Sequence, residues 1–191
     1  MSVSPAHLVR LHSASSYCTG TLVAPDVVLT CGHFFIPLLA KLRSVMCSVG
    51  EERRRIDELY LFPGTDIALV TLTKPVVLGD FPTIGPPPSL LSQTVTFGFG
   101  GGARTPNARA GRYLTPLPLA VSRAGYTRVR PAGLVLSGAI KGDSGGPIVA
   151  KGRIFAVQSL ILDPYGRNLR LATVALVSPR VVDKLEALKR R

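Results

Sequence analysis

The chain has 191 residues, which suits one domain or two small halves that share a cleft. Its 19 glycines and 16 prolines, with no tryptophan and only one long helical pattern, favour an all-β protein. A net charge of +12 would draw an anionic partner to a basic surface, but no helix-turn-helix, zinc-finger or RNA-binding signature accompanies it.

The sequence lacks the features of a membrane, metal-binding or disulfide-rich protein. No apolar run approaches the roughly 18 residues of a membrane helix and no signal peptide is visible, so we expect no membrane partner and a chain that is cytoplasmic or secreted with its leader removed. No Cys/His spacing of the zinc type occurs, and we expect no metal and no cofactor. The odd count of Cys18, Cys31 and Cys47 excludes complete pairing; Cys31 is expected as a buried free thiol, while a Cys18–Cys31 bridge stays open.

Short apolar stretches in the first third of the chain predict strands. These strands are expected at residues 6–12, 19–23, 27–30 and 43–49. His7 and His12 are expected on the polar face or at the end of the first strand. The charged residues 51–55 are interpreted as a solvent-exposed hairpin loop.

One histidine and one acid stand at strand ends in this region. His33 follows the strand predicted at residues 27–30, with Gly32 beside it. Asp66 opens an apolar stretch, where burying a carboxylate is costly unless a donor or a positive group meets it. A histidine held by Asp66 in the tautomer that can accept a proton would remove that cost. We therefore expect His33 and Asp66 to meet.

The second half of the chain predicts a second β-unit. Residues 74–90 contain five prolines and no long periodic pattern, which is typical of a connection. Residues 103–112 are basic and contain glycine, and we interpret them as an exposed, mobile loop. Ser178, Pro179 and an apolar stripe beyond them predict a C-terminal helix over 179–191. Strands are expected at residues 93–100, 117–122, 126–129, 134–136, 148–150, 154–162 and 169–177.

A glycine-rich stretch surrounds Ser144: residues 141–147 read Lys-Gly-Asp-Ser-Gly-Gly-Pro. Such glycine density marks backbone that turns sharply or approaches another group closely. A serine hydroxyl becomes a nucleophile when a base takes its proton, and the oxyanion formed by its attack on a carbonyl needs donors. The N–H groups of Gly142 and Ser144 could supply them.

The order of residues along the chain decides which type of hydrolase Ser144 would serve. All three histidines precede Ser144, so the α/β-hydrolase order is excluded even though residues 142–146 match G-x-S-x-G. A subtilisin-like order would use Asp26 and would need alternating strands and helices, which are missing. The order histidine, acid, serine remains.

With these features the chain resembles the trypsin/chymotrypsin family of serine proteases over nearly its whole length. The resemblance rests on four motifs, at residues 18–22, 29–33, 66–69 and 142–147. It implies a single protease domain of two six-stranded Greek-key β-barrels, with residues 1–80 in the first, 91–178 in the second and the helix at 179–191.

The resemblance also implies roles for individual residues. His33 would be the general base and acid, Asp66 its orienting carboxylate, Ser144 the nucleophile, and the N–H groups of Gly142 and Ser144 the oxyanion hole. Ser159 matches the serine that hydrogen-bonds the buried aspartate and begins the strand that pairs with the substrate. Where most relatives have a cysteine after the histidine, this chain has Phe34, so the usual bridge to Cys18 is missing.

The specificity pocket departs from the trypsin pattern. Gly138 stands where trypsin-like members carry an aspartate, so cleavage after Lys or Arg is not expected. Ile161 stands where open-pocket relatives have glycine, which narrows the pocket for a small or medium apolar residue. Arg167 or Arg170 could instead reach the pocket and favour an acidic residue. The expected lining is Gly138, Ala139, Lys141, Gln158, Leu160, Ile161 and Ala172.

The acid before the nucleophile, Asp143, also needs a partner. In zymogen-type members a newly cut N-terminal amine meets this acid, whereas some bacterial relatives use an internal arginine. We favour an internal partner because an unpaired buried carboxylate costs several kcal/mol. The alternative is an oxyanion loop that stays disordered until a partner binds. The candidate partners are Arg104, Arg109, Arg112 and Arg123.

Two functions follow from these observations. The first is a monomeric serine endopeptidase that cleaves peptide or protein substrates. The second is a latent or partner-activated protein of the same fold whose basic surface binds polyanions.

Overall fold

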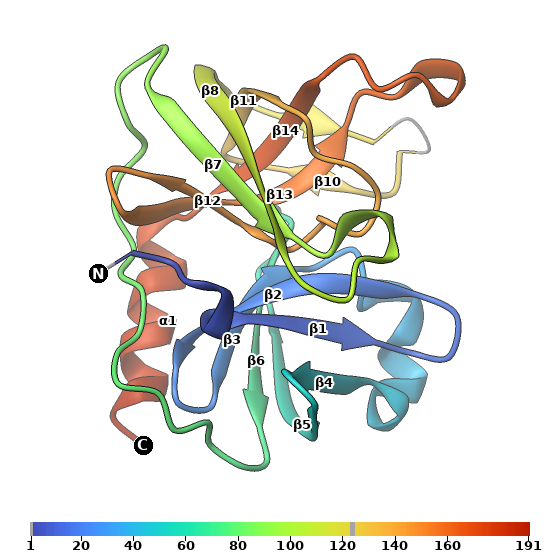
Figure 1. Cartoon of the computed structure of the whole chain (residues 1–191), viewed down its shortest axis with the longest axis vertical. Helices are drawn as coiled ribbons and strands as arrows, with labels where there is room; N and C mark the ends of the chain where they lie inside the picture. Colours follow the sequence, from blue (N-terminus) through green and yellow to red (C-terminus); the bar gives the residue numbers. More distant parts are fainter. Residues whose placement is uncertain (1, 123–124) are drawn as a thin grey trace.

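Six strands close into an antiparallel barrel over the first part of the computed structural model, which describes residues 2–122 and 125–191 (Figure 1). The strands are β1 (Leu8–His12), β2 (Tyr17–Ala24), β3 (Val27–Cys31), β4 (Met46–Val49), β5 (Glu52–Leu61) and β6 (Ile67–Leu72). Around the barrel they follow the order β1-β2-β3-β6-β5-β4. Every residue of β3 and β6 is buried, and both strands consist mainly of the aliphatic and β-branched residues that fit a pleated, packed surface.

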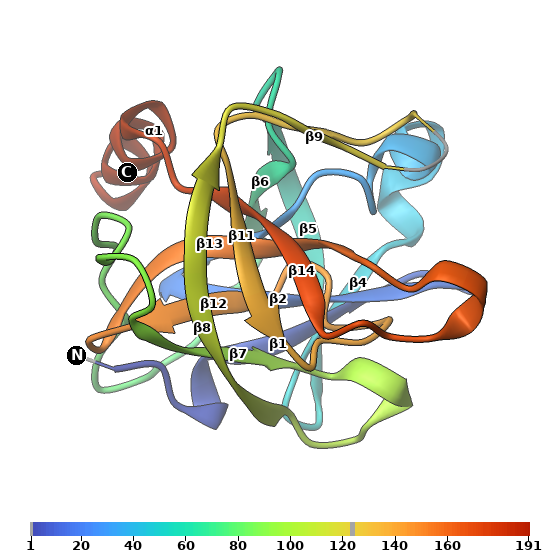
Figure 2. The same cartoon turned by 90° about the horizontal axis from the view of Figure 1, so that it is seen from above.

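Six further strands form a second closed barrel in the order β11-β14-β13-β12-β7-β8 (Figure 2). They are β7 (Gln93–Gly98), β8 (Asn107–Leu117), β11 (Ala132–Ser137), β12 (Pro147–Ala150), β13 (Arg153–Ile161) and β14 (Leu171–Leu176). A small two-stranded sheet, β9 (Ala120–Val121) with β10 (Arg128–Val129), lies between β8 and β11 in the chain. The all-β fold with two six-stranded barrels is thus as the sequence predicted.

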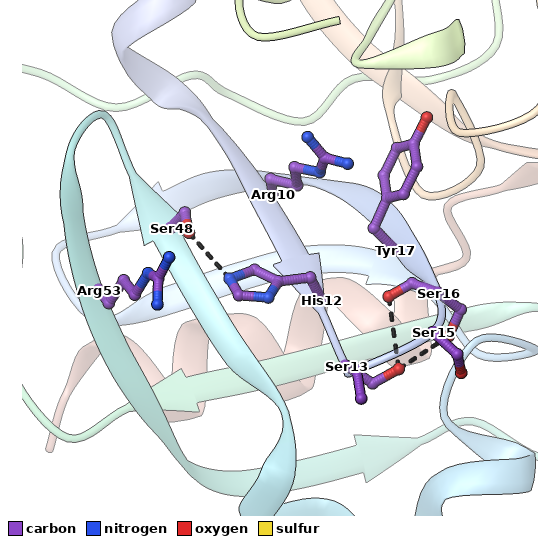
Figure 3. A pocket seen from close by; sticks show the side chains of 9 residues that line it. Arg10, His12, Ser13, Ser15, Ser16, Tyr17, Ser48 and Arg53 are labelled. Carbon is purple, nitrogen blue, oxygen red and sulfur yellow. Dashed lines mark hydrogen bonds between the residues drawn. The ribbon is translucent and has the colours of Figure 1, made fainter. Parts of the chain in front are cut away.

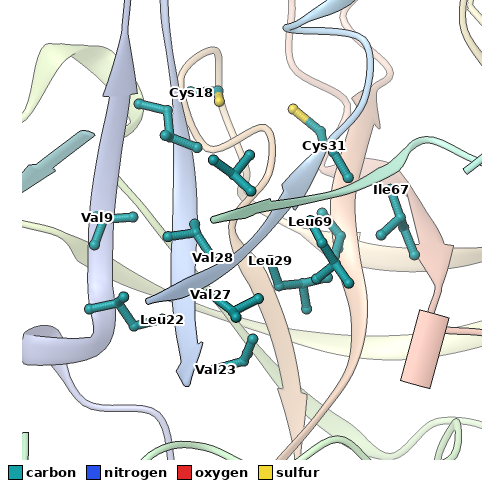
Figure 4. Close-up of a cluster of buried hydrophobic side chains, with 14 of the residues drawn as sticks. Val9, Cys18, Leu22, Val23, Val27, Val28, Leu29, Cys31, Ile67 and Leu69 are labelled. Carbon is teal, nitrogen blue, oxygen red and sulfur yellow. The ribbon is translucent and has the colours of Figure 1, made fainter. Parts of the chain in front are cut away.

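One apolar core runs from the first barrel to the C-terminal helix, α1 (Pro179–Lys189). Figure 4 shows its side chains inside the first barrel, among them Leu22 and Leu69. The core also includes Val181, Leu185 and Leu188, the buried stripe of α1. Although α1 follows the second barrel in the chain, it packs against β3 of the first, and each buried aliphatic side chain contributes about 1.5–3 kcal/mol.

The remaining regular elements are short 3₁₀ turns: η1 (Pro5–His7), η2 (Ile36–Ser44), η3 (Gly100–Gly102) and η4 (Pro164–Gly166). Among the residues described, no helix has the length and apolar character needed to cross a membrane. Cys18, Cys31 and Cys47 are all buried and unpaired, so the bridge left open between Cys18 and Cys31 is not formed.

Two charged segments that the sequence analysis interpreted as loops are strands. Residues 52–55 begin β5 and pair with β4, while residues 107–112 belong to β8, which pairs with both β7 and β11. Their charged side chains are mostly exposed on the outer faces, so the apolar alternation that reveals a half-buried strand is missing. Each strand is needed to close its barrel, a requirement of the whole fold that local pattern does not express.

One smaller expectation, on the bounds of a strand, is also corrected. Residues 43–44 end η2, so only the later part of the strand expected at 43–49 exists, as β4. His7 ends η1 directly before β1, so it lies at the end of the strand, which is one of the two positions expected for it; it is 3% exposed, and its Nε2 lies 3.0 Å from the Asp80 carbonyl oxygen. This contact, with a residue distant in the chain, satisfies the buried ring.

Candidate active site

His33 and Asp66 meet at the ends of two paired strands of the first barrel. Cys31 pairs with Ile67, so the residue that precedes β6 lies beside the turn that follows β3. Asp66 accepts hydrogen bonds from the ring Nδ1 of His33 and from its backbone N–H, both at 2.7 Å. Asp66 is 3% exposed and the His33 side chain 28%. These two bonds orient the imidazole and leave Nε2 as the nitrogen that can accept a proton.

The second barrel also holds this carboxylate. The hydroxyl of Ser159, in β13, donates a hydrogen bond to Oδ2 of Asp66, and Ser159 is itself buried. A buried carboxylate is stable only when donors replace its lost hydration. Asp66 therefore joins the two barrels at the site.

Ser144 lies in the loop between β11 and β12, and the main chain of this loop is tied to both barrels. The Ser144 carbonyl accepts the Thr19 N–H at 2.7 Å, and the Gly145 N–H donates to the Gln158 carbonyl at 2.8 Å. Gly145 has a φ of +83°, and a Cβ there would lie 2.1 Å from the Thr19 carbonyl oxygen. Glycine is therefore required directly after Ser144.

The Ser144 hydroxyl makes no hydrogen bond with His33 in the described part of the chain. A polar neighbour of His33 Nε2 is the Cys31 Sγ, at 3.9 Å. The loop of Ser144 nevertheless lies against the end of β3, because a Cβ on Gly145 would lie 3.1 Å from the backbone nitrogen of Cys31. Hydrogen bonds of this kind are often long before a substrate binds.

The N–H groups of Gly142 and Ser144 donate no hydrogen bond within residues 2–122 and 125–191. Gly142 has a φ of +100°, and a Cβ there would lie 2.3 Å from the hydroxyl oxygen of Tyr17. Only glycine fits this turn. Two unengaged N–H groups beside a serine hydroxyl can stabilise a developing oxyanion.

Asp143 is fully buried and is satisfied by an internal arginine. Arg109 Nε donates to Oδ2 at 2.7 Å, and the N–H groups of Gly100 and Ile140 donate to the carboxylate at 2.7 and 2.9 Å. A Cβ on Gly98 or Gly100 would lie 2.5 Å from Asp143 Oδ1, so both glycines make room for the carboxylate.

Of the other arginines considered for this position, Arg104 is exposed. Arg112 donates to the Leu91 carbonyl at 3.1 Å, and Arg123 lies outside the described residues. Sequence reasoning left four candidates because it interpreted residues 103–112 as a mobile loop. Strand β8 instead carries Arg109 to the base of the oxyanion loop.

The pKa of His33 depends on two neighbouring groups, the Cys31 thiol and the Asp66 carboxylate. Burial raises the pKa of the Cys31 thiol well above its usual value, so its sulfur is uncharged at neutral pH. The pKa of His33 is raised above 6.5: a charge on Cys31 would contribute most, burial opposes the shift, and the hydrogen-bonded Asp66 raises it. Because Cys31 stays protonated, we assign the upward shift to Asp66.

Several residues expected in a specificity pocket lie on neighbouring segments. Ile161 of β13 pairs with Ala172 of β14, and Ala139 is buried on the loop before Ser144. A Cβ on Gly138 would meet no atom within 4 Å, so the space beside it is open. The Lys141 side chain is 89% exposed and lies 3.8 Å from Asp163.

The remaining pocket candidates are partly internal. Gln158 is 1% exposed, and its amide donates to the Leu160 carbonyl at 3.1 Å. Asn168, which sequence reasoning did not single out, donates to the Ala139 carbonyl at 2.6 Å. Arg170 lines a separate cavity of about 380 Å³ with residues of β7, β8 and β11.

Thr19 is a second site residue, which the sequence placed in a strand and in the motif at residues 18–22 but without a role of its own. It is fully buried; its hydroxyl donates to the Gly142 carbonyl at 2.8 Å and accepts the Phe99 N–H at 3.0 Å. A threonine in a strand buried on both faces needs partners for its hydroxyl, and this requirement is the signal that could have marked it.

A comparison with known families shows the family of the chain. Residues 18–157 match the model of the trypsin-like peptidase domain. The chain belongs to this family. By family, it is therefore a serine endopeptidase and its substrates are peptides or proteins.

Individual relatives agree with this assignment. A snake venom serine protease homolog from Bothrops jararacussu is 28% identical over 204 residues, covering 90% of this chain and 78% of that protein. The chain also shares its fold with Kallikrein-related peptidase 10, at a TM-score of 0.74 and 21% identity over 98% of both chains.

Two other solved structures show the same fold. The active form of the Rv3671c protease from M. tuberculosis has a TM-score of 0.73 at 18% identity, covering 95% of this chain and 80% of that one. A Glu endopeptidase has a TM-score of 0.75 at 15% identity, covering 100% and 96%.

Proposed function

We propose that this peptidase cleaves its substrates through Ser144, His33 and Asp66. The observation that carries the proposal is the pair of 2.7 Å hydrogen bonds from His33 to Asp66, because they fix the imidazole with Nε2 left for a proton. The position of Gly145 against the end of β3, where a Cβ would lie 3.1 Å from the Cys31 nitrogen, supports the approach of Ser144 to this ring.

In the proposed mechanism, the Ser144 hydroxyl oxygen attacks the carbonyl carbon of the scissile bond while His33 Nε2 takes its proton. The oxyanion of the tetrahedral intermediate accepts hydrogen bonds from the Gly142 and Ser144 N–H groups. The imidazolium, stabilised by Asp66, then protonates the leaving amine as the C–N bond breaks. Water hydrolyses the acyl-enzyme by the same steps in reverse and restores Ser144.

The oxyanion loop is proposed to be held in its working conformation by Arg109. The ion pair with the fully buried Asp143 supports this role, since it satisfies the carboxylate without any terminal amine. Arg109 acts through the position of the loop and not on the substrate.

The substrate residue before the scissile bond is proposed to be small or medium and apolar. Its pocket contains no acid at Gly138, and the branched side chain of Ile161 takes space from it. The backbone of the same substrate portion would pair with β13 from Ser159 onward, as an added antiparallel strand.

A fluorophosphonate probe, which phosphonylates an activated serine, tests the proposal. We expect labelling of the wild type, none of Ser144→Ala, and labelling at least about a hundredfold slower in His33→Ala. Ser178→Ala is the matched control, because the Ser178 side chain makes no capping hydrogen bond. A folded wild-type chain that resists the probe would contradict the proposal and favour the polyanion-binding alternative.

A further inference from the structure

A pocket of about 390 Å³ on the first barrel, separate from the residues that the proposed chemistry uses, is lined by cations and hydroxyl groups (Figure 3). Its side chains come from β1, β4, β5, the turn between β1 and β2, and the first residue of β2. The cationic, titratable and aromatic side chains of the lining, with one hydroxyl group of β4, are Arg10, His12, Tyr17, Ser48 and Arg53.

The cations of this pocket have no counter-charge. Within residues 2–122 and 125–191, neither Arg10 nor Arg53 forms an ion pair with a carboxylate. Arg10 instead stacks on Tyr17, with 3.8 Å between the guanidinium carbon and the ring centroid, which orders its side chain and leaves its N–H groups available.

The imidazole of His12 is affected by the positive charges of Arg10 and Arg53. His12 Nε2 lies 3.0 Å from the Ser48 hydroxyl. The pKa of His12 is lowered by burial and further by the charges of Arg53 and Arg10. An anion placed here would relieve that repulsion and accept hydrogen bonds from several groups at once.

The strand register places the pocket at a defined distance from Ser144. The Thr19 N–H binds the Ser144 carbonyl, and Thr19 pairs with Arg10, Arg10 with Ser48, and Ser48 with Arg53. From Thr19 to Arg53 this row crosses three strand spacings, or about 14 Å, and Arg10 lies one spacing from Thr19. An extended polypeptide covers that length in about four residues.

Direction along the substrate follows from the proposed function, on which this inference rests. The acyl portion of the substrate is assigned to β13, so the leaving portion departs past Tyr17 on the other side of Ser144. Tyr17 lies against the loop that holds Gly142 and Ser144, because a Cβ on Gly142 would lie 2.3 Å from its hydroxyl oxygen. The same hydroxyl accepts the Gly102 N–H of η3 at 2.7 Å.

We infer that Arg10, His12 and Arg53 bind an acidic side chain of the substrate, Asp or Glu, about three to five residues beyond the scissile bond. A polypeptide fits better than a nucleic acid. The row of cations starts at the peptidase loop, and Arg10 covers one face of the Tyr17 ring, so that face cannot stack on a base.

The first test measures cleavage of peptides that share one scissile bond and carry Glu, Ala or Lys at the third to fifth residues after it. We expect kcat/KM to be about tenfold higher for the Glu peptide than for the Ala peptide at low salt, and lower still for Lys. In Arg10→Gln/Arg53→Gln this ranking should collapse to within about twofold.

The matched control is Arg180→Gln/Arg190→Gln, which removes the same net charge from exposed residues at α1. It should keep the ranking. The single variant Arg53→Gln changes an exposed side chain and keeps the stack of Arg10 on Tyr17, so it separates loss of charge from loss of folding. It should show part of the loss of preference for the Glu peptide.

The second test needs no chemistry. In Ser144→Ala protein, the peptide that follows the scissile bond should bind more tightly with Glu than with Ala, and it should shift the ring signals of His12 in NMR spectra but not those of buried His7. A chain that binds the Glu peptide but cleaves nothing would refute the proposed function alone. Equal cleavage and binding of all three peptides, or binding of a short RNA through these arginines in place of the Glu peptide, would overturn the inference.

Discussion

In the first barrel, His33 and Asp66 stand at the ends of β3 and β6, two buried strands that pair over their whole length. In the second, Ser144 and Asp143 stand in a glycine-rich loop that has no ladder of its own. Backbone pairing fixes the first half of the site, whereas one buried ion pair and a few main-chain bonds fix the second. The two halves should therefore fail in different ways.

The largest effect is expected from the first half. Asp66→Asn keeps the size of the side chain but presents an amide to the ring, so His33 loses the partner that orients it and stabilises its charged form. We expect kcat/KM to fall by roughly 10⁴ with the fold retained. Peptide cleavage measures kcat/KM, and thermal unfolding monitored by circular dichroism shows whether the fold is retained. A loss below about tenfold would show that Asp66 does not orient the base.

The second half should lose stability as well as activity. Arg109→Gln leaves the buried Asp143 carboxylate without its cation, which costs about 3–5 kcal/mol in unfolding free energy. Loss of the oxyanion loop should lower kcat by about 10²–10³. Urea unfolding and peptide cleavage check both values.

A double variant separates the charge effect from other causes. Adding Asp143→Asn to Arg109→Gln removes the unpaired charge, so it should recover much of the stability but little activity. Arg112→Gln, on the exposed side of the same strand, is the matched control and should change neither. Additive losses in the double variant would contradict a specific ion pair.

The same contrast explains what could be predicted from the sequence. His33 and Asp66 follow and precede apolar strands, so their meeting could be expected from local pattern and the cost of a buried charge. The partner of Asp143 in the oxyanion loop could not be predicted in this way. Arg109 lies in β8, and the mostly exposed residues at the start of β8 give no apolar alternation that would indicate a strand. Likewise β5 is evident only from the need to close the barrel, and the partner of His7 is a carbonyl distant in the chain.

A smaller effect is expected on the preference for the substrate residue before the scissile bond, whose pocket is assigned to the second barrel. Ile161→Gly should widen the pocket beside Gly138 and Ala172. We expect kcat/KM for a peptide with Phe before the scissile bond to rise relative to Ala by about 10- to 100-fold. A peptide library digested by wild type and variant measures the shift. Strict cleavage after Lys or Arg by the wild type would contradict the assigned pocket.

The smallest effect concerns which neighbour sets the pKa of His33. In the proposed mechanism the neutral imidazole of His33 is the base, so kcat/KM should rise with pH through this pKa, which lies above 6.5. If Asp66 raises the pKa, the rising limb moves to lower pH in Asp66→Asn, measured on its residual activity. Cys31→Ala should shift it by less than about half a unit, because burial keeps that thiol protonated and uncharged. An equally large acid shift in Cys31→Ala would instead mean that a Cys31 thiolate pairs with the imidazolium, and the pH–rate profiles of the two variants distinguish these cases.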